Sequence, residues 1–231
     1  MEQEPINKFT IPLAIVAAGA LVAGAIYFGD GNQPTTNDRQ STTNTKIEVP
    51  GVTAEDHYLG SRSAKLVIVE YSDTECPFCK TFQNTMKNVL NAYPAEVAWV
   101  YRQLPISQLH SRAVKEAEAT ECAAELGGNQ AFWNYLDELF RVTPSNDGLD
   151  PAELPRIAGT IGLDVPSFNT CLTSGKYTEI IKRGVEESYK AGIPLATPYS
   201  IILNQNGEVK GIINGAEPLA SVEAKINALL K

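Results

Sequence analysis

Two cysteines separated by two residues, Cys76 and Cys79, are the part of the sequence best suited to chemistry. They lie in the segment ECPFCK, between a β-branched run and an amphipathic run. At a strand-to-helix junction, the unpaired N–H groups of the first helical turn stabilise a thiolate. We therefore interpret Cys76 as the nucleophile. Cys79, one helical turn later, is the candidate resolving thiol that attacks a mixed disulfide formed at Cys76.

The same cysteine spacing also occurs in zinc sites and in purely structural disulfides. The chain has no second C-x-x-C, and its two histidines, His57 and His110, have no ligand-like spacing. A disulfide that closes so short a loop gains little chain-entropy stabilisation. We therefore expect no metal ion and no other cofactor, and the pattern favours reactive cysteines.

Hydrophobic periodicity predicts the elements that position the cysteines. Lys65 to Tyr71 is a short β-branched run, which is typical of a buried strand. Apolar residues from Phe78 to Tyr93 recur at spacings of three and four, which predicts a helix. Residues 97–104 predict the next strand, so the cysteines belong to a β-α-β unit.

Helical patterns continue through about residues 107–191 and predict an all-helical insertion. We expect four helix breakers within it: Gly127, Gly128, Pro144 and Pro166. Short strands at 199–203 and 209–213 then follow, joined at an Asn-Gly turn, and a helix at 218–230 ends the chain.

Length and charge limit the function. The chain has 231 residues, about 1.5 times the length usually allotted to one domain. It carries 19 basic and 27 acidic side chains, a formal net charge of −8. Such a chain cannot neutralise a row of phosphates, so we expect no nucleic-acid partner.

The N-terminal segment predicts a membrane address. Residues 9–28 carry no charge, and 16 of these 20 residues are apolar, enough for a helix of roughly 30 Å. We expect residues 1–29 to form an uncleaved anchor, with a signal peptide cleaved after Ala25 as the alternative. Residues 30–52 are polar and predict a flexible tether, and 53–231 form the folded domain.

The segments VEYSDTECPFCKTF and GIPLATPYSIILNQNGEVKGIINGA, together with the helical insertion, resemble the DsbA-like branch of the thioredoxin superfamily. The resemblance extends from about His57 to the C-terminus. It implies an α/β thioredoxin fold with an all-helical insertion, here preceded by a single N-terminal transmembrane helix. It also implies a protein thiol-disulfide oxidoreductase.

The resemblance assigns roles to further residues. Pro198 matches the family's cis proline opposite the cysteines, with an ordinary trans proline at a strand start as the alternative. We expect the backbone of Thr197, together with Pro77 and Phe78, to contact substrate. Glu70 matches the family's buried acid and could exchange a proton with Cys79; alternatively it faces solvent.

Two further cysteines, Cys122 and Cys171, lie in helical segments of the insertion. Cysteines at comparable places in some DsbA-like relatives imply a structural disulfide between them. A bridge that closes this loop could stabilise the fold by about 4 kcal/mol on the chain-entropy model. Two buried free thiols are the alternative, because cysteine is often buried.

The function that follows is oxidation of cysteines in unfolded secreted proteins on the extracytoplasmic side of the cell membrane. A membrane partner of the DsbB or vitamin-K-epoxide-reductase type would reoxidise the enzyme. The alternatives are a reductase or isomerase of the same fold, or a non-catalytic peptide-binding chaperone; Thr197 resembles the reductase and isomerase members. Phe78 replaces the histidine of the strongest oxidant, and Asp73 and Glu75 are expected to raise the pKa of Cys76, so we predict a weaker oxidant.

Overall fold

The computed structural model describes residues 47–231. The predicted anchor, 1–29, and residues 30–46 of the predicted tether lie outside this range. The last residues of that predicted tether, 47–52, are described, and Ile47, Val49 and Val52 pack against the core of the domain. Within residues 47–231, no helix combines the length and the apolar character needed to cross a bilayer.

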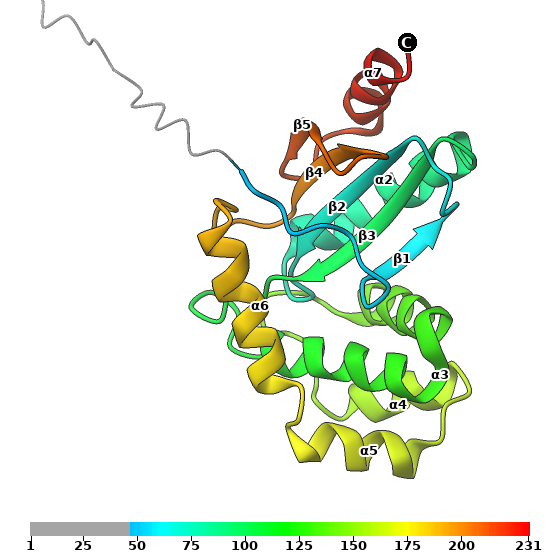
Figure 1. Ribbon diagram of the computed structural model, residues 1–231. Coiled ribbons are helices and arrows are strands. Elements are labelled where there is room, and N and C mark those ends of the chain that lie inside the picture. The colour runs from blue at the N-terminus through cyan, green and yellow to red at the C-terminus, as the bar shows by residue number, and fades with distance from the viewer. Residues whose placement is uncertain (1–46) are drawn as a thin grey trace, which may run out of the picture. The chain divides into compact units, whose positions relative to one another are not determined.

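A five-stranded mixed sheet forms the centre of the domain, in the order β1-β3-β2-β4-β5 (Figure 1). β2 runs parallel to β3, and β4 runs antiparallel to β2. β1 and β5 are the antiparallel edge strands. The strands are β1 (His57–Gly60), β2 (Leu66–Ser72), β3 (Val97–Gln103), β4 (Tyr199–Asn204) and β5 (Val209–Asn214).

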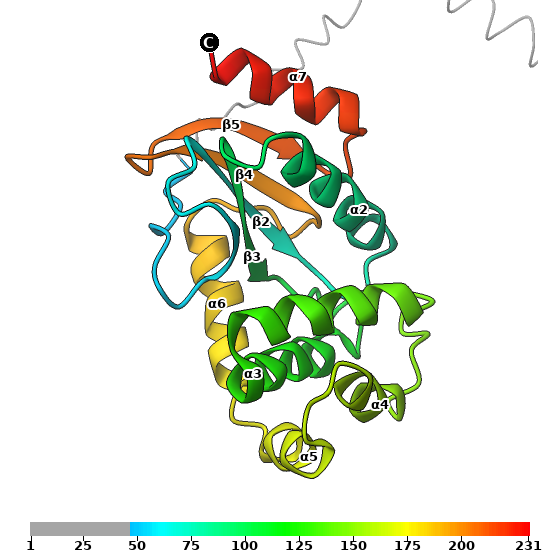
Figure 2. The ribbon, with the colours of Figure 1, turned by 90° about the vertical axis from the view of Figure 1, so that its right-hand side faces the viewer.

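Helices cover both faces of this sheet (Figure 2). α2 (Pro77–Ala92) and α7 (Leu219–Leu229) pack on one face, where a cluster around Phe82, Trp99 and Ile202 is fully buried. α6 (Thr178–Lys190) lies over the other face, where Val69, Val100 and Ile201 are fully buried. Both faces of β2 are therefore covered, which explains its nearly continuous apolar sequence.

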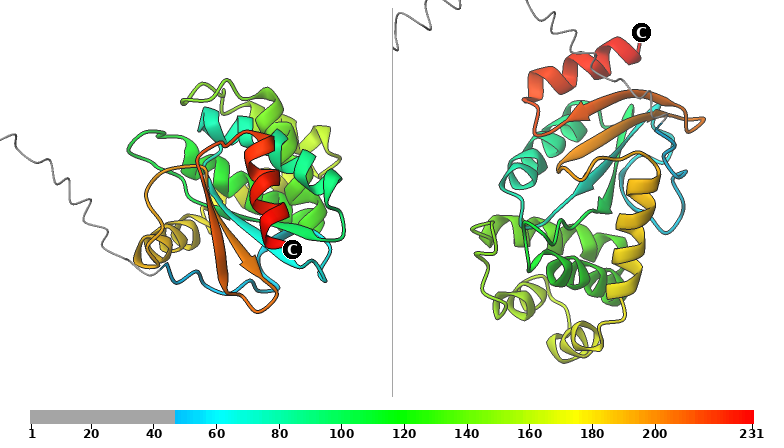
Figure 3. Two further views of the ribbon diagram at one scale, coloured as in Figure 1. Left: turned by 90° about the horizontal axis from the view of Figure 1, so that it is seen from above. Right: turned by 90° about the vertical axis from the view of Figure 1, so that its left-hand side faces the viewer.

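The remaining helices form the insertion beneath the sheet: α3 (Ala113–Val142), α4 (Glu153–Thr160) and α5 (Val165–Ser174). The right-hand view of Figure 3 shows α6 returning from this group to the sheet. The insertion has its own core, in which Tyr135 stacks on Phe168. The predicted thioredoxin fold with a helical insertion is thus confirmed.

The predicted helix break at Gly127 and Gly128 is confirmed: Gly128 has φ 71° and ψ −169°, so α3 consists of two helical halves across a kink. Two details differ from the sequence prediction. β1 was not predicted, because four residues are too few to show a period. Pro166 does not break a helix: it lies in the first turn of α5, where proline is favoured because its missing N–H has no helical partner.

Candidate active site

The two cysteines lie at the junction between β2 and α2. Cys76 is the N-cap residue of α2, and Pro77 follows in the first turn. Cys79 lies on the buried face of the helix, and both thiols are free. Because Cys76 is the N-cap residue, its sulfur adjoins the unpaired N–H groups at the helix start, including the amides of Phe78 and Cys79.

The surroundings separate the two cysteines by pKa. A hydrogen bond from the Cys79 thiol, helped by the Thr197 side chain and the amides of Cys79 and Phe78, outweighs burial and lowers the pKa of Cys76 to about 6. Burial, followed by the bond to Cys76 and its charge, raises the pKa of Cys79 well above its usual value. Cys76 is therefore the thiolate at neutral pH, and Cys79 keeps its proton.

Thr197 and Pro198 lie across from the cysteines. Tyr199, the first residue of β4, pairs with Tyr71 near the end of β2, and this register brings the preceding residues beside the cysteine loop. The Thr197–Pro198 peptide bond is cis. The Cys76 thiol donates to the Thr197 carbonyl oxygen at 3.4 Å. The nucleophile candidate thus touches backbone that precedes β4.

Glu70 lies beneath the cysteines rather than in solvent. It is 1% exposed, on the face of β2 that α2 covers, and Trp99 Nε1 donates to its Oε2 at 2.9 Å. Burial raises the pKa of Glu70 to about 7, despite that hydrogen bond, and the nearby Cys76 charge adds to the shift. A carboxyl group that titrates near neutral pH below a protonated thiol can accept or donate its proton.

The structure corrects the expected electrostatic effect of Asp73 and Glu75. The Asp73 carboxylate accepts the amide N–H groups of Glu75 and Ile106, at 2.9 and 2.8 Å. It also lies 2.9 Å from Nδ1 of the buried His110. The hydrogen bond and charge of Asp73 outweigh burial and raise the pKa of His110. Asp73 therefore has a partner in His110, whose protonated form it favours, and the pKa of Cys76 is lowered rather than raised.

His110 is a site residue that the sequence analysis missed. It lies in the segment after β3, outside any recognised motif. One signal could have found it: β2 and β3 are parallel, so residues that follow them meet at the same edge of the sheet. His110 follows β3 by seven positions, and Asp73 follows β2 directly.

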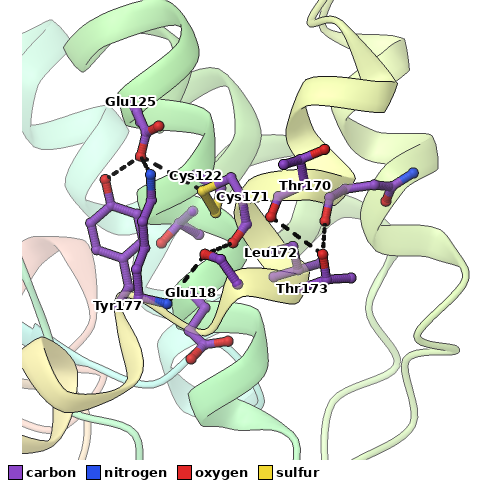
Figure 4. The surroundings of a disulfide bond; sticks show 12 residues. Glu118, Cys122, Glu125, Thr170, Cys171, Leu172, Thr173 and Tyr177 are labelled. Carbon is purple, nitrogen blue, oxygen red and sulfur yellow. Dashed lines mark hydrogen bonds and ion pairs between the residues drawn. A yellow bond between two sulfur atoms is a disulfide. The ribbon is translucent and has the colours of Figure 1, made fainter.

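Cys122 and Cys171 form a disulfide in this structure, with an S–S distance of 2.01 Å. It joins α3 to α5, and Figure 4 shows Glu125 and Tyr177 beside it. Tyr177 donates to Glu125 at 2.8 Å. The bridge belongs to the core of the insertion, apart from the cysteine loop.

Exposed apolar side chains adjoin the site. Phe78, between the cysteines, is 64% exposed. Leu195 precedes the cis peptide by two positions and Leu109 precedes His110, and both are also exposed. Exposed apolar side chains thus lie next in sequence to residues of the site.

Comparison with known proteins agrees with this geometry. The family model described as Thioredoxin matches residues 52–213. The crystal structure of DsbA2 from Pseudomonas aeruginosa has 28% sequence identity and a TM-score of 0.65, covering 78% of this chain and 97% of that one. α-DsbA1 from Wolbachia pipientis shares the fold at 21% identity, with a TM-score of 0.67, covering 81% and 96% of the two chains.

Similarity also extends to larger proteins. Na⁺/H⁺ antiporter NhaA 3 of Salinispora tropica is 36% identical over 140 residues, which is 61% of this chain. The matched segment is 20% of the antiporter. The chain thus spans about one fifth of the length of this curated relative.

Proposed function

The chain belongs to the thioredoxin family, and we propose that it is a DsbA-like protein thiol-disulfide oxidoreductase that forms disulfides in extracytoplasmic proteins. The observation that carries the proposal is the contrast between the two cysteines. Cys76, at the start of α2, has a pKa of about 6, whereas the buried Cys79 has a pKa well above its usual value. A stable thiolate at Cys76 makes it a good leaving group and stabilises the reduced enzyme, which favours oxidation of substrates.

The proposed reaction starts from the Cys76–Cys79 disulfide. A substrate thiolate attacks Cys76 Sγ, the S–S bond breaks, and Cys79 leaves with the electron pair and takes a proton from Glu70. A second substrate thiolate then attacks the substrate sulfur of the mixed disulfide. Cys76 leaves as a thiolate, so the substrate is oxidised and the enzyme reduced by two electrons. Thr197, Pro77 and Phe78 are the proposed substrate contacts, and Pro198 keeps Thr197 in position.

We propose that this reaction takes place on the extracytoplasmic side of a membrane, with the catalytic domain 53–231 held by an anchor at 1–29 and a tether at 30–52. The disulfide between Cys122 and Cys171 supports an oxidising compartment. The similarity to a segment of Na⁺/H⁺ antiporters supports a place beside a membrane, and we propose no transport activity for this chain. A membrane partner of the DsbB or vitamin-K-epoxide-reductase type would reoxidise Cys76 and Cys79.

The test is oxidation of an unfolded peptide with two cysteines by the oxidised protein. We expect the peptide disulfide and reduced enzyme to appear in equal amounts, and the Cys76→Ser variant to produce neither. A reduction potential near that of thioredoxin, about −270 mV, would instead favour the reductase alternative. Absence of turnover in both the oxidation and the reduction of the peptide would contradict a thiol-disulfide oxidoreductase.

A further inference from the structure

Glu75, the residue directly before the nucleophile, connects the cysteine loop to the helical insertion. Its side chain is fully buried. Its carbonyl oxygen accepts the N–H of Asn146 at 2.8 Å, and its Oε2 accepts the N–H of Asp147 at 2.6 Å. Its second carboxyl oxygen, Oε1, is buried and has no hydrogen-bond donor. One half of this carboxyl group is thus satisfied, and the other half is not.

Glu116, in the helical insertion, also has a buried carboxyl oxygen without a hydrogen-bond donor. It lies in the first turn of α3, is 2% exposed, and its Oε2 is buried without a donor. After burial, the side chain of Glu75 is the largest cause of the raised pKa of Glu116, so the two carboxyl groups are neighbours, while a hydrogen bond from the Thr74 side chain acts in the opposite direction. Ionised carboxylates accept hydrogen bonds but cannot donate them, so two facing carboxylates would leave both oxygens unsatisfied.

The groups around the pair offer no compensating positive charge. Among residues 47–231, neither Glu75 nor Glu116 forms an ion pair with a lysine or arginine. Lys115 is bonded to Glu118 and Leu172, and His110 to Asp73. Asp73, Asp147 and Tyr135 are the other titratable groups near the pair, and none of them is a cation. Two uncompensated buried carboxylates would carry a large desolvation cost, as in paired catalytic acids.

We propose that Glu75 and Glu116 share a single proton, and that this carboxyl–carboxylate hydrogen bond positions the Cys76 loop on the helical insertion. The proton resides mainly on Glu116, because burial and then the neighbouring Glu75 raise the pKa of that residue to about 10. Glu116 is therefore a positioning residue: it acts on Cys76 through Glu75. The shared proton rests on the buried, unsatisfied oxygens of these two carboxyl groups and not on the proposed function, whereas its effect on exchange rests on the proposed function.

The first test measures the proton by its linkage to stability. The folded state would hold one proton more than the unfolded state from about pH 4.5 to about pH 10. The unfolding constant of the wild type, divided by that of Glu116→Gln, should therefore rise about tenfold per pH unit between about pH 6 and pH 9. Contributions of Glu70 and His110 cancel in this ratio, because both proteins contain them. A flat ratio would overturn the shared proton.

Glu118→Gln is the matched control. Glu118 is also 2% exposed and lies two residues along the same helix, but Lys115 Nζ is 2.6 Å from its Oε2. The unfolding constant of the wild type, divided by that of Glu118→Gln, should not change over the same pH range, since the Glu118 carboxylate already has Lys115 as its counterion. If Glu118→Gln shows the same slope as Glu116→Gln, the effect is not specific to the pair and the proposal is wrong.

The second test asks whether the pair positions Cys76. A glutamine at position 116 mimics a protonated glutamate, so Glu116→Gln should keep the wild-type pKa of Cys76 and the wild-type exchange rate. Glu116→Met fills the space without a donor and should slow exchange several-fold. A fall in the pKa of Cys76 in Glu116→Gln would show that Glu116 is ionised in the wild type. Equal exchange rates in the two variants would refute the positioning role.

A third measurement uses only the wild-type protein, so it does not depend on whether a variant folds. At about pH 9 Glu70, with a pKa of about 7, is ionised, so a carbonyl infrared band of a protonated carboxyl group in the wild type would come from the pair. Absence of the band would refute the shared proton. A protein that passes the linkage and infrared tests but oxidises no dithiol would contradict the proposed function and leave the shared proton intact.

Discussion

The Sγ atom of Cys76 lies 3.4 Å from the carbonyl oxygen of Thr197, although 121 positions separate the two residues in the chain. The side chain of Thr197 also helps to lower the pKa of this thiol. The same residue thus contacts Cys76 through its backbone and favours the thiolate form. Cys76 has only 5% of its surface exposed, so these contacts act with little competition from water.

Replacing the cysteines one at a time should separate their roles. Cys76→Ser removes the candidate nucleophile and should reduce exchange to the uncatalysed rate. Cys79→Ser keeps the nucleophile but removes the resolving thiol, so it should accumulate a mixed disulfide with substrate. Mass spectrometry after limiting alkylation of the reduced wild type checks the assignment: Cys76 should be labelled first, and prior labelling of Cys79 would reverse it.

Thr197→Val should raise the pKa of Cys76 by about one unit, because the hydroxyl hydrogen bond to the thiolate is lost. The thiolate absorbance of the reduced protein, followed against pH, measures the shift. Thr197→Ser keeps a hydroxyl and serves as the control, with a titration close to that of the wild type. Identical curves for the valine and serine variants would show that the hydroxyl has no effect.

His110→Asn removes the titratable imidazole that faces Asp73 while keeping a hydrogen-bond donor. We expect a higher pKa for Cys76, because the protonated form of His110 and the Cys76 thiolate favour each other. The pKa of His110 is raised in the folded state, so its contribution to stability is complete below about pH 6.5 and is lost as pH rises through the folded pKa. The stability advantage of the wild type over the variant should shrink accordingly in denaturant titrations.

A control for this variant exists in the other histidine. His57 pairs with Glu121 at 2.9 Å and stacks on Phe132, and it has no contact with Asp73. His57→Gln should leave the Cys76 titration unchanged. If both variants shift the titration equally, the effect of His110 is not specific to its place beside Asp73.

Glu70→Gln should stabilise the protein at alkaline pH. The folded pKa of about 7 lies above the ordinary 4.5, so the wild type loses stability as pH rises between these values. The expected gain for the variant is up to ~3 kcal/mol at about pH 8 and small at about pH 5. Denaturant unfolding at both pH values measures the difference in unfolding free energy between the variant and the wild type. The same difference at both pH values would mean that Glu70 does not titrate in this range.

The reduction potential should lie between about −120 mV, the value for DsbA, and about −270 mV, the value for thioredoxin. Phe78 gives the Cys76 thiolate no charge, and the pKa of about 6 comes from hydrogen bonds. Phe78→His would add a dipolar or cationic partner and should raise the potential. Equilibration with glutathione measures both proteins; no rise in the variant would show that groups outside the C-x-x-C segment control the thiolate.

Local sequence patterns determined much of this protein. The β-branched run of β2 and the apolar face of α2 required burial, and their junction required the cysteines to lie at a helix start. The insertion was predictable for the same reason, since its helices carry the 3.6-residue period. β1 was not predictable from the sequence, because its pairing with β3 involves only four residues.

Tertiary structure decided the electrostatics of the site. Asp73 and Glu75 are two acids near a cysteine in the sequence, which suggested a raised pKa for Cys76. The fold pairs Asp73 with His110 and turns Glu75 toward Glu116, residues that come from the segment after β3 and from α3. A charge acts through its distance and its partners in space, and these depend on how distant segments pack. Residue order therefore located both thiols and the helix start that favours a thiolate at Cys76. Tertiary packing brought Thr197 to that thiol and gave Asp73 and Glu75 their partners.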